Sequence, residues 1–148
     1  MIEPHVCTTK RRFEVLQIMA ENNIPTVVWL SPILPFINDT RENITGILDY
    51  CIRAKVYGIL CFGIGMTLRE GNREYFYAAL DRHFPGLHEK YHKKYGYQYE
   101  IVSERGRELM EYFRAECKKH HIVCDVEALF AYFHEFPENK GYEQMSLF

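Results

Sequence analysis

The stretch PTVVWLSPILPFINDT, residues 25–40, decides the fold class. Its first part, Thr26 to Leu30, is β-branched and apolar on both faces, which is typical of a strand in a parallel sheet that is covered on both sides. Pro32 and Pro35 cannot donate hydrogen bonds to a neighbouring strand, so the strand is expected to end near Ser31. The stretch therefore predicts a buried parallel strand that is followed at once by a turn.

Helices and a second strand are predicted around this stretch. Asp39, as the N-cap, and Glu42 predict the beginning of a helix, whose apolar stripe follows at helical spacing: Ile44, Ile47, Leu48 and Cys51. The run VYGILCF, residues 56–62, predicts a second buried strand. A helix capped by Thr8 or Thr9 is expected before the first strand, another after the second strand, and a last one capped by Asp125. This order predicts an α/β fold with βαβ crossovers.

Composition limits the class of protein. The chain has 148 residues, of which 47% are hydrophobic and 26% charged, values that suit one globular domain. A formal net charge of −2 excludes a chain-wide nucleic-acid-binding surface but permits a local basic face. No apolar run reaches the roughly 18 residues that span a bilayer, and the N-terminal residues lack the pattern of a secretory signal. Without such a signal we expect a cytoplasmic protein, and without such a run we expect no membrane partner. The five cysteines are an odd number at irregular spacing, so we expect them to be reduced thiols.

Three segments together carry a resemblance to a known family. They are residues 25–39, residues 58–72 (GILCFGIGMTLREGN) and residues 2–12 (IEPHVCTTKRR). The sequence resembles the radical S-adenosylmethionine superfamily, in particular the branch called spore photoproduct lyase-like or DNA repair photolyase-related. The resemblance implies the C-terminal half of a partial (β/α)6 TIM-like barrel. Its expected parts are half-barrel β/α units at 1–86, a mostly helical extension of the same domain at 87–136, and a flexible tail at 137–148.

The resemblance also implies a cofactor site. In the family, the segments after the fifth and sixth barrel strands hold the adenosyl group of S-adenosylmethionine. The matching positions here are Ser31, Ile33, Pro35 and Asn38 on the first segment and Phe62, Gly63, Gly65 and Met66 on the second. Ligands generally bind at the carboxyl ends of parallel strands, which is where both segments are expected. Phe36 stands where many family members have glycine, and from spacing alone the prolines and glycines could serve only to end the strands.

The iron–sulfur cluster of the family has no matching loop in this sequence. Family members hold a four-iron four-sulfur cluster in a C-x-x-x-C-x-x-C loop, a spacing that no group of cysteines here reproduces. The resemblance therefore implies a longer parent protein, in which the cluster and S-adenosylmethionine generate a 5′-deoxyadenosyl radical and the enzyme acts as a lyase on DNA lesions. This chain alone is expected to hold no cofactor and to be inactive.

The predicted strands leave a second interpretation open. Two parallel strands expose two edges and form no stable sheet alone, so a missing N-terminal half-barrel or a second copy must supply the neighbouring strands. The alternative to an enzyme fragment is a free-standing, non-catalytic α/β interaction module that dimerises through its strand edges. Self-association is expected under both interpretations.

Smaller patterns have more ordinary explanations. His88 and His92, four residues apart, could bind a metal but more often form a solvated helix face. Lysines and tyrosines alternate over residues 90–99, a pattern that could contact DNA or could pack at the rim of a core. One further group fits no closed zinc site: Cys117, His120, His121 and Cys124.

The last five residues form a motif of their own: Gln144, Met145, Ser146, Leu147 and Phe148. They resemble the pentapeptide Gln-Leu-Ser/Asp-Leu-Phe by which bacterial DNA polymerases and repair proteins dock on the DNA sliding clamp. Gln144 would hydrogen-bond in a polar notch while the apolar side chains fill a cleft. The alternative is that Leu147 and Phe148 fold back onto the domain's own surface.

Overall fold

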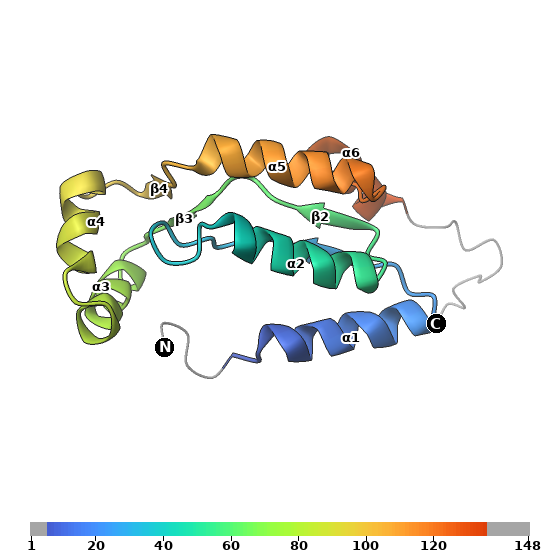
Figure 1. The fold of residues 1–148 in the computed structure, drawn as a ribbon, viewed down its shortest axis with the longest axis horizontal. Helices are drawn as coiled ribbons and strands as arrows, with labels where there is room; N and C mark the ends of the chain where they lie inside the picture. Colours follow the sequence, from blue (N-terminus) through green and yellow to red (C-terminus); the bar gives the residue numbers. More distant parts are fainter. Residues whose placement is uncertain (1–5, 136–148) are drawn as a thin grey trace, which may run out of the picture.

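The protein is described by a computed structural model, which places residues 6–135. The described residues form helices and short strands (Figure 1). The helices are α1 Thr9–Glu21, α2 Arg41–Arg53, α3 Asn72–His83, α4 Leu87–Tyr95, α5 Gly106–Lys119 and α6 Val126–His134. The strands are β1 Val27–Trp29, β2 Gly58–Leu60, β3 Gly65–Thr67 and β4 Glu100–Val102. The predicted α/β class is therefore confirmed.

The two predicted strands pair in parallel, as expected. In the register of β1 and β2, Val28 lies opposite Ile59, and α2 forms the crossover between them. A parallel bridge joins Gly58 to Val123, which follows α5, so a third extended segment lies on the other side of β2. β1, α2 and β2 thus form one β-α-β unit, and α5 leads into the third extended segment after the insertion of β3, α3, α4 and β4. Within residues 6–135 these strands form no closed barrel.

Helices lie on both faces of the parallel sheet. Ile59 is fully buried and belongs to a core that includes residues of α1, α2 and α5. Its neighbour Gly58 faces the other way, since side chains alternate along a strand, and a Cβ atom there would lie 2.5 Å from Leu129 Cδ2 in α6. α6 therefore covers the face of β2 opposite to α2 and α5.

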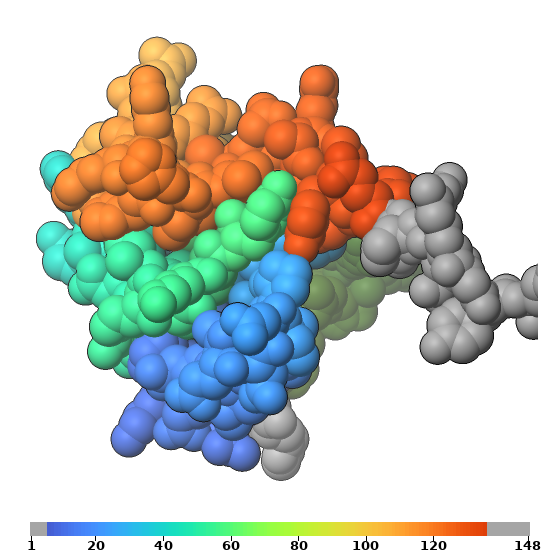
Figure 2. Space-filling model, turned by 90° about the vertical axis from the view of Figure 1, so that its right-hand side faces the viewer, coloured from blue at the N-terminus to red at the C-terminus, as the bar shows by residue number. Residues whose placement is uncertain are grey.

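Figure 2 shows the end of the molecule where the chain enters the strands. The segments that lead into β1 and β2 lie side by side there, and Tyr57 N donates a hydrogen bond of 2.9 Å to Thr26 O. The Tyr57 ring stacks on Tyr132 of α6 with the ring centroids 3.9 Å apart. The stacked rings of Tyr57 and Tyr132 thus lie at the end of the sheet where the chain enters β2.

A second, antiparallel sheet was not predicted from the sequence. β3 pairs with β4. These two strands, α3 and α4 pack around a second hydrophobic cluster: Leu68, Phe76, Tyr77, Leu80, Tyr91, Tyr95 and Ile101. Gly65 permits this pairing, because a Cβ atom at that position would lie 2.1 Å from Ile101 O. The close approach of the two strands therefore requires glycine.

Two of the helix caps predicted from the sequence are confirmed, and one is wrong. Thr8 caps α1 and Asp125 caps α6, as predicted. The prediction of Asp39 as the cap of α2 is wrong, because the cap is Thr40. Asp39 is instead buried and accepts a hydrogen bond of 2.5 Å from Ser103 Oγ. Its carboxylate ties the loop before α2 to the segment between β4 and α5.

Candidate functional site

The structure brings the two predicted cofactor segments together. β1 and β2 end side by side, with Leu30 N donating to Leu60 O at 2.9 Å. Beyond the strands, Ile33 N donates to Gly65 O at 3.0 Å. The loop after β1 and the segment after β2 are therefore joined by backbone hydrogen bonds at the carboxyl end of the parallel sheet.

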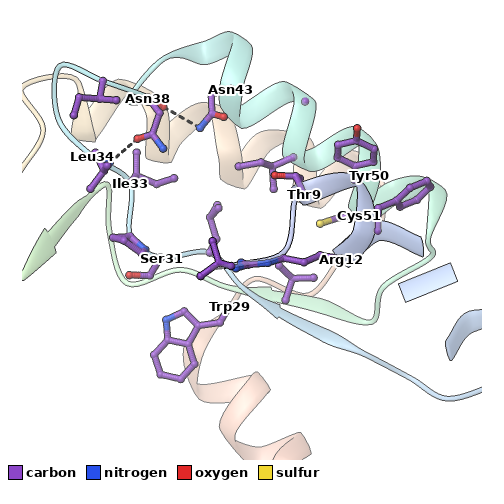
Figure 3. Close-up of a pocket in the computed structure, with 18 of the residues that line it drawn as sticks. Thr9, Arg12, Trp29, Ser31, Ile33, Leu34, Asn38, Asn43, Tyr50 and Cys51 are labelled. Carbon is purple, nitrogen blue, oxygen red and sulfur yellow. Dashed lines mark hydrogen bonds between the residues drawn. The ribbon is translucent and has the colours of Figure 1, made fainter. Parts of the chain in front are cut away.

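Two large aromatic side chains are exposed at this end. Trp29 at the end of β1 is 63% exposed and Phe62 after β2 is 61% exposed. Their ring centroids are 5.7 Å apart with the planes at 61°, an edge-to-face contact. Trp29 points away from α2, on the opposite side of the strand (Figure 3). Sequence reasoning included Phe62 but missed Trp29, although its place at the end of an otherwise apolar strand could have indicated it.

Local hydrogen bonds fix the loop after β1. Asn38 Oδ1 accepts from Leu34 N at 2.6 Å, and Asn43 Nδ2 donates to Asn38 O at 2.9 Å (Figure 3). Pro35 O accepts a hydrogen bond from the hydroxyl of Tyr91. Asn38 and Pro35 therefore have structural partners, and Ile33 is buried in the core. Ser31 is the exposed one of the four predicted residues in this loop.

The segment after β2 is equally constrained. Gly63 O accepts a weak hydrogen bond from Cys61 Sγ at 3.6 Å. Gly65 and Met66 belong to β3, and Met66 packs against the second hydrophobic cluster. Phe62 is therefore the position on this segment whose side chain is most open to a ligand.

A cavity of about 720 Å³ lies beside this site, between α1, α2, β1 and the loop after β1 (Figure 3). Three of the predicted cofactor residues line it: Ser31, Ile33 and Asn38. The other five do not: Pro35, Phe62, Gly63, Gly65 and Met66. Sequence reasoning missed the part that α1 takes in this cavity, since residues so far apart along the chain give no local signal of their contact.

The described cysteines are not gathered with other potential metal ligands. Among residues 6–135, no three cysteine, histidine or acidic side chains converge as metal ligands do. Burial raises the pKa of Cys51 to about 11 and also raises the pKa of Cys61. Burial therefore favours the protonated thiol at these two positions.

The histidine and lysine patterns also have local partners. His88 Nδ1 lies 2.9 Å from Asp81 Oδ1, whereas the His92 ring contacts Tyr97. Lys90 lies over the ring of Phe36, with Nζ 3.9 Å from the centroid. Within residues 90–99, two tyrosines are buried and two are exposed: Tyr91 and Tyr95, and Tyr97 and Tyr99 respectively.

Comparison with family models, with curated proteins and with solved structures finds no match for this chain. None of the helices described between residues 6 and 135 is long and apolar enough to cross a membrane. The motif from Gln144 to Phe148 lies outside the described residues. Function must therefore be argued from the site itself.

Proposed function

We propose that this chain forms the adenosyl-binding and substrate-facing part of a radical S-adenosylmethionine protein, with a DNA-lesion lyase as the activity of the whole. The observation that carries the proposal is the backbone contact between Ile33 and Gly65, which joins the two segments where the resemblance expects the adenosyl group. Carboxyl ends of parallel strands are general ligand sites. In this proposal the four-iron four-sulfur cluster belongs to another part of the protein, because the cysteines of this sequence do not have the C-x-x-x-C-x-x-C spacing.

The residues at this site have separate roles in the proposal. Trp29 and Phe62 offer exposed aromatic faces on which a planar base can stack. The exposed Ser31 offers a hydroxyl group, while the backbone around Gly63 can approach the ligand closely. S-adenosylmethionine, when bound beside a reduced cluster, supplies hydrogen-abstraction chemistry. The residues of this chain bind and orient the ligand.

The experiment begins with the gene. The reading frame upstream of Met1 should contain a C-x-x-x-C-x-x-C loop, and the longer product should take up a cluster under anaerobic reconstitution, whereas this chain alone should not. Trp29 is the only tryptophan in the chain, and adding S-adenosylmethionine to the longer product should quench its fluorescence once any other tryptophan has been replaced. A stop codon directly upstream of Met1, or cluster absorbance in this chain, would overturn the proposal.

Matched variants test the site within the longer product. Phe62→Ala should lower the affinity for S-adenosylmethionine about tenfold, since one stacking contact contributes roughly 1–3 kcal/mol, and should leave the cluster in place. Tyr75→Ala removes an aromatic ring of similar exposure from α3 and should change nothing. Equal affinities for the two variants would count against the site.

A second candidate function is an interaction module that dimerises through its strand edges. Among residues 6–135, β1 pairs on one edge only. Apolar side chains are also exposed on α1 and on the connection from α1 to β1: Val15, Ile18 and Ile24. Unpaired strand edges and exposed apolar side chains are both typical of sites that contact another chain.

A further inference from the structure

The cavity between α1, α2 and β1 is a separate candidate site. Its volume of about 720 Å³ lies within the range typical of small-molecule sites. Most of its wall is apolar and includes Phe13, Leu16, Val28, Leu30, Ile47 and Phe84. Trp29 is one of the residues that line it, but the Trp29 ring points to the side of β1 opposite to α2 (Figure 3). Phe62 does not line the cavity, so a ligand between α1 and α2 would not lie between these two rings.

Gly46 shows that α2 leaves this space open. The residue lies in the middle of α2 and lines the cavity. Glycine in a helix interior lowers stability relative to alanine, and here no packing demands it, because a Cβ atom would meet no other atom within 4 Å. A large side chain at this position would enter the cavity.

Arg12 supplies a positive charge at the cavity. It is the one basic side chain among the residues that line the cavity, and in Figure 3 it extends along the space beneath α2. Its neighbour Arg11 pairs with Glu14 at 2.8 Å, but among the described residues Arg12 has no ion-pair partner. The acidic residue in the wall, Glu42, is held at the start of α2, where hydrogen bonds with its own backbone and with Thr40 lower its pKa.

We propose that this cavity binds a small amphipathic anion, with its apolar body between α1, α2 and β1 and its anionic group paired with the Arg12 guanidinium. The apolar walls would contact the apolar body of the ligand, and the guanidinium group of Arg12 would pair with its negative charge. Arginine pairs with carboxylates through two parallel hydrogen bonds, so aliphatic or aryl carboxylates are the class that the site fits best. The inference does not depend on the proposed function.

The test uses two probes on this chain. The fluorescent anion 8-anilinonaphthalene-1-sulfonate should bind with saturable enhancement, and decanoate should displace it. Gly46→Phe, which fills the cavity, should weaken binding of both at least about tenfold. Asp49→Phe adds the same ring to an exposed position of α2 that does not line the cavity and should bind as the unmodified protein does. Unchanged binding by Gly46→Phe would overturn the proposed location.

A second pair of variants tests the charge. Arg12→Gln should weaken decanoate binding about tenfold, because a charge-assisted pair is lost, while binding of the neutral decanol stays the same. Arg11→Gln removes the adjacent charge outside the cavity and should have no effect on either. Equal decanoate affinities for the two arginine variants would overturn the role of Arg12. Both variants change an exposed side chain, so this arm remains decisive even if Gly46→Phe fails to fold.

Discussion

At the scale of single residues, Gly46 and Gly65 are glycines with opposite consequences. We expect Gly46→Ala to raise the free energy of unfolding by about 0.5–1 kcal/mol, because alanine favours the helix and its Cβ atom meets nothing within 4 Å. Gly65→Ala should lower it by about 1–3 kcal/mol, since the new Cβ atom would collide with Ile101 O. Urea unfolding followed by circular dichroism measures both. Changes of the same sign would contradict this account.

Thiol reactivity gives a second test at this scale. Cys7 is exposed, whereas burial raises the pKa of Cys51 to about 11 and also raises the pKa of Cys117. Because the thiolate is the reactive form, a maleimide at pH 7 should label Cys7 quickly and leave the buried thiols unmodified until the chain unfolds. Mass spectrometry counts the adducts, and Cys7→Ser should lose the fast one. Rapid labelling of Cys51 in the folded protein would refute the assigned burial.

At the scale of elements, one buried hydrogen bond joins two connections that lie far apart in the sequence. Ser103 Oγ donates to Asp39 and accepts from Arg105 N at 3.1 Å. Ser103→Ala leaves the buried carboxylate without this donor, so we expect a loss of about 1–3 kcal/mol in the free energy of unfolding. In an Asp39→Ala background the same substitution should cost less, which a double-mutant cycle measures. Additive losses would show that the contact contributes nothing.

The sequence predicted the elements whose signals are local. The apolar runs around Val28 and Ile59 and the caps Thr8 and Asp125 are continuous or closely spaced, and their structures are confirmed. The antiparallel pair β3 and β4 was missed, because strands of three residues offer little alternation and their pairing joins segments more than 30 residues apart. Asp39 was misassigned for a similar reason, since its partner Ser103 is remote in sequence. The cavity depends on α1 packing beside α2, which no local pattern reveals.

At the scale of the whole molecule, the open edge of β1 predicts self-association. The apolar side chains of Val15, Ile18 and Ile24 are exposed on α1 and on the connection to β1, and burying them together with the edge would stabilise a dimer. Light scattering coupled to size exclusion should therefore give a mass above the monomer that rises with concentration. Ile18→Lys should shift the protein toward the monomer, whereas Tyr75→Lys on α3 should not. A monomer at every concentration would show that no second copy uses this edge.

The motif from Gln144 to Phe148, which lies beyond the described residues, predicts a protein partner. Met145, Leu147 and Phe148 could bury enough apolar surface in a cleft to give several kcal/mol before ordering costs. A fluorescent peptide covering 142–148 should therefore bind a bacterial sliding clamp with a micromolar dissociation constant. Replacing Leu147 and Phe148 with alanine should abolish binding, while a serine-to-aspartate change at Ser146 should preserve it, because the clamp motif accepts either residue. No binding at high micromolar clamp would remove the clamp as a partner and favour packing of the two apolar residues on the domain itself.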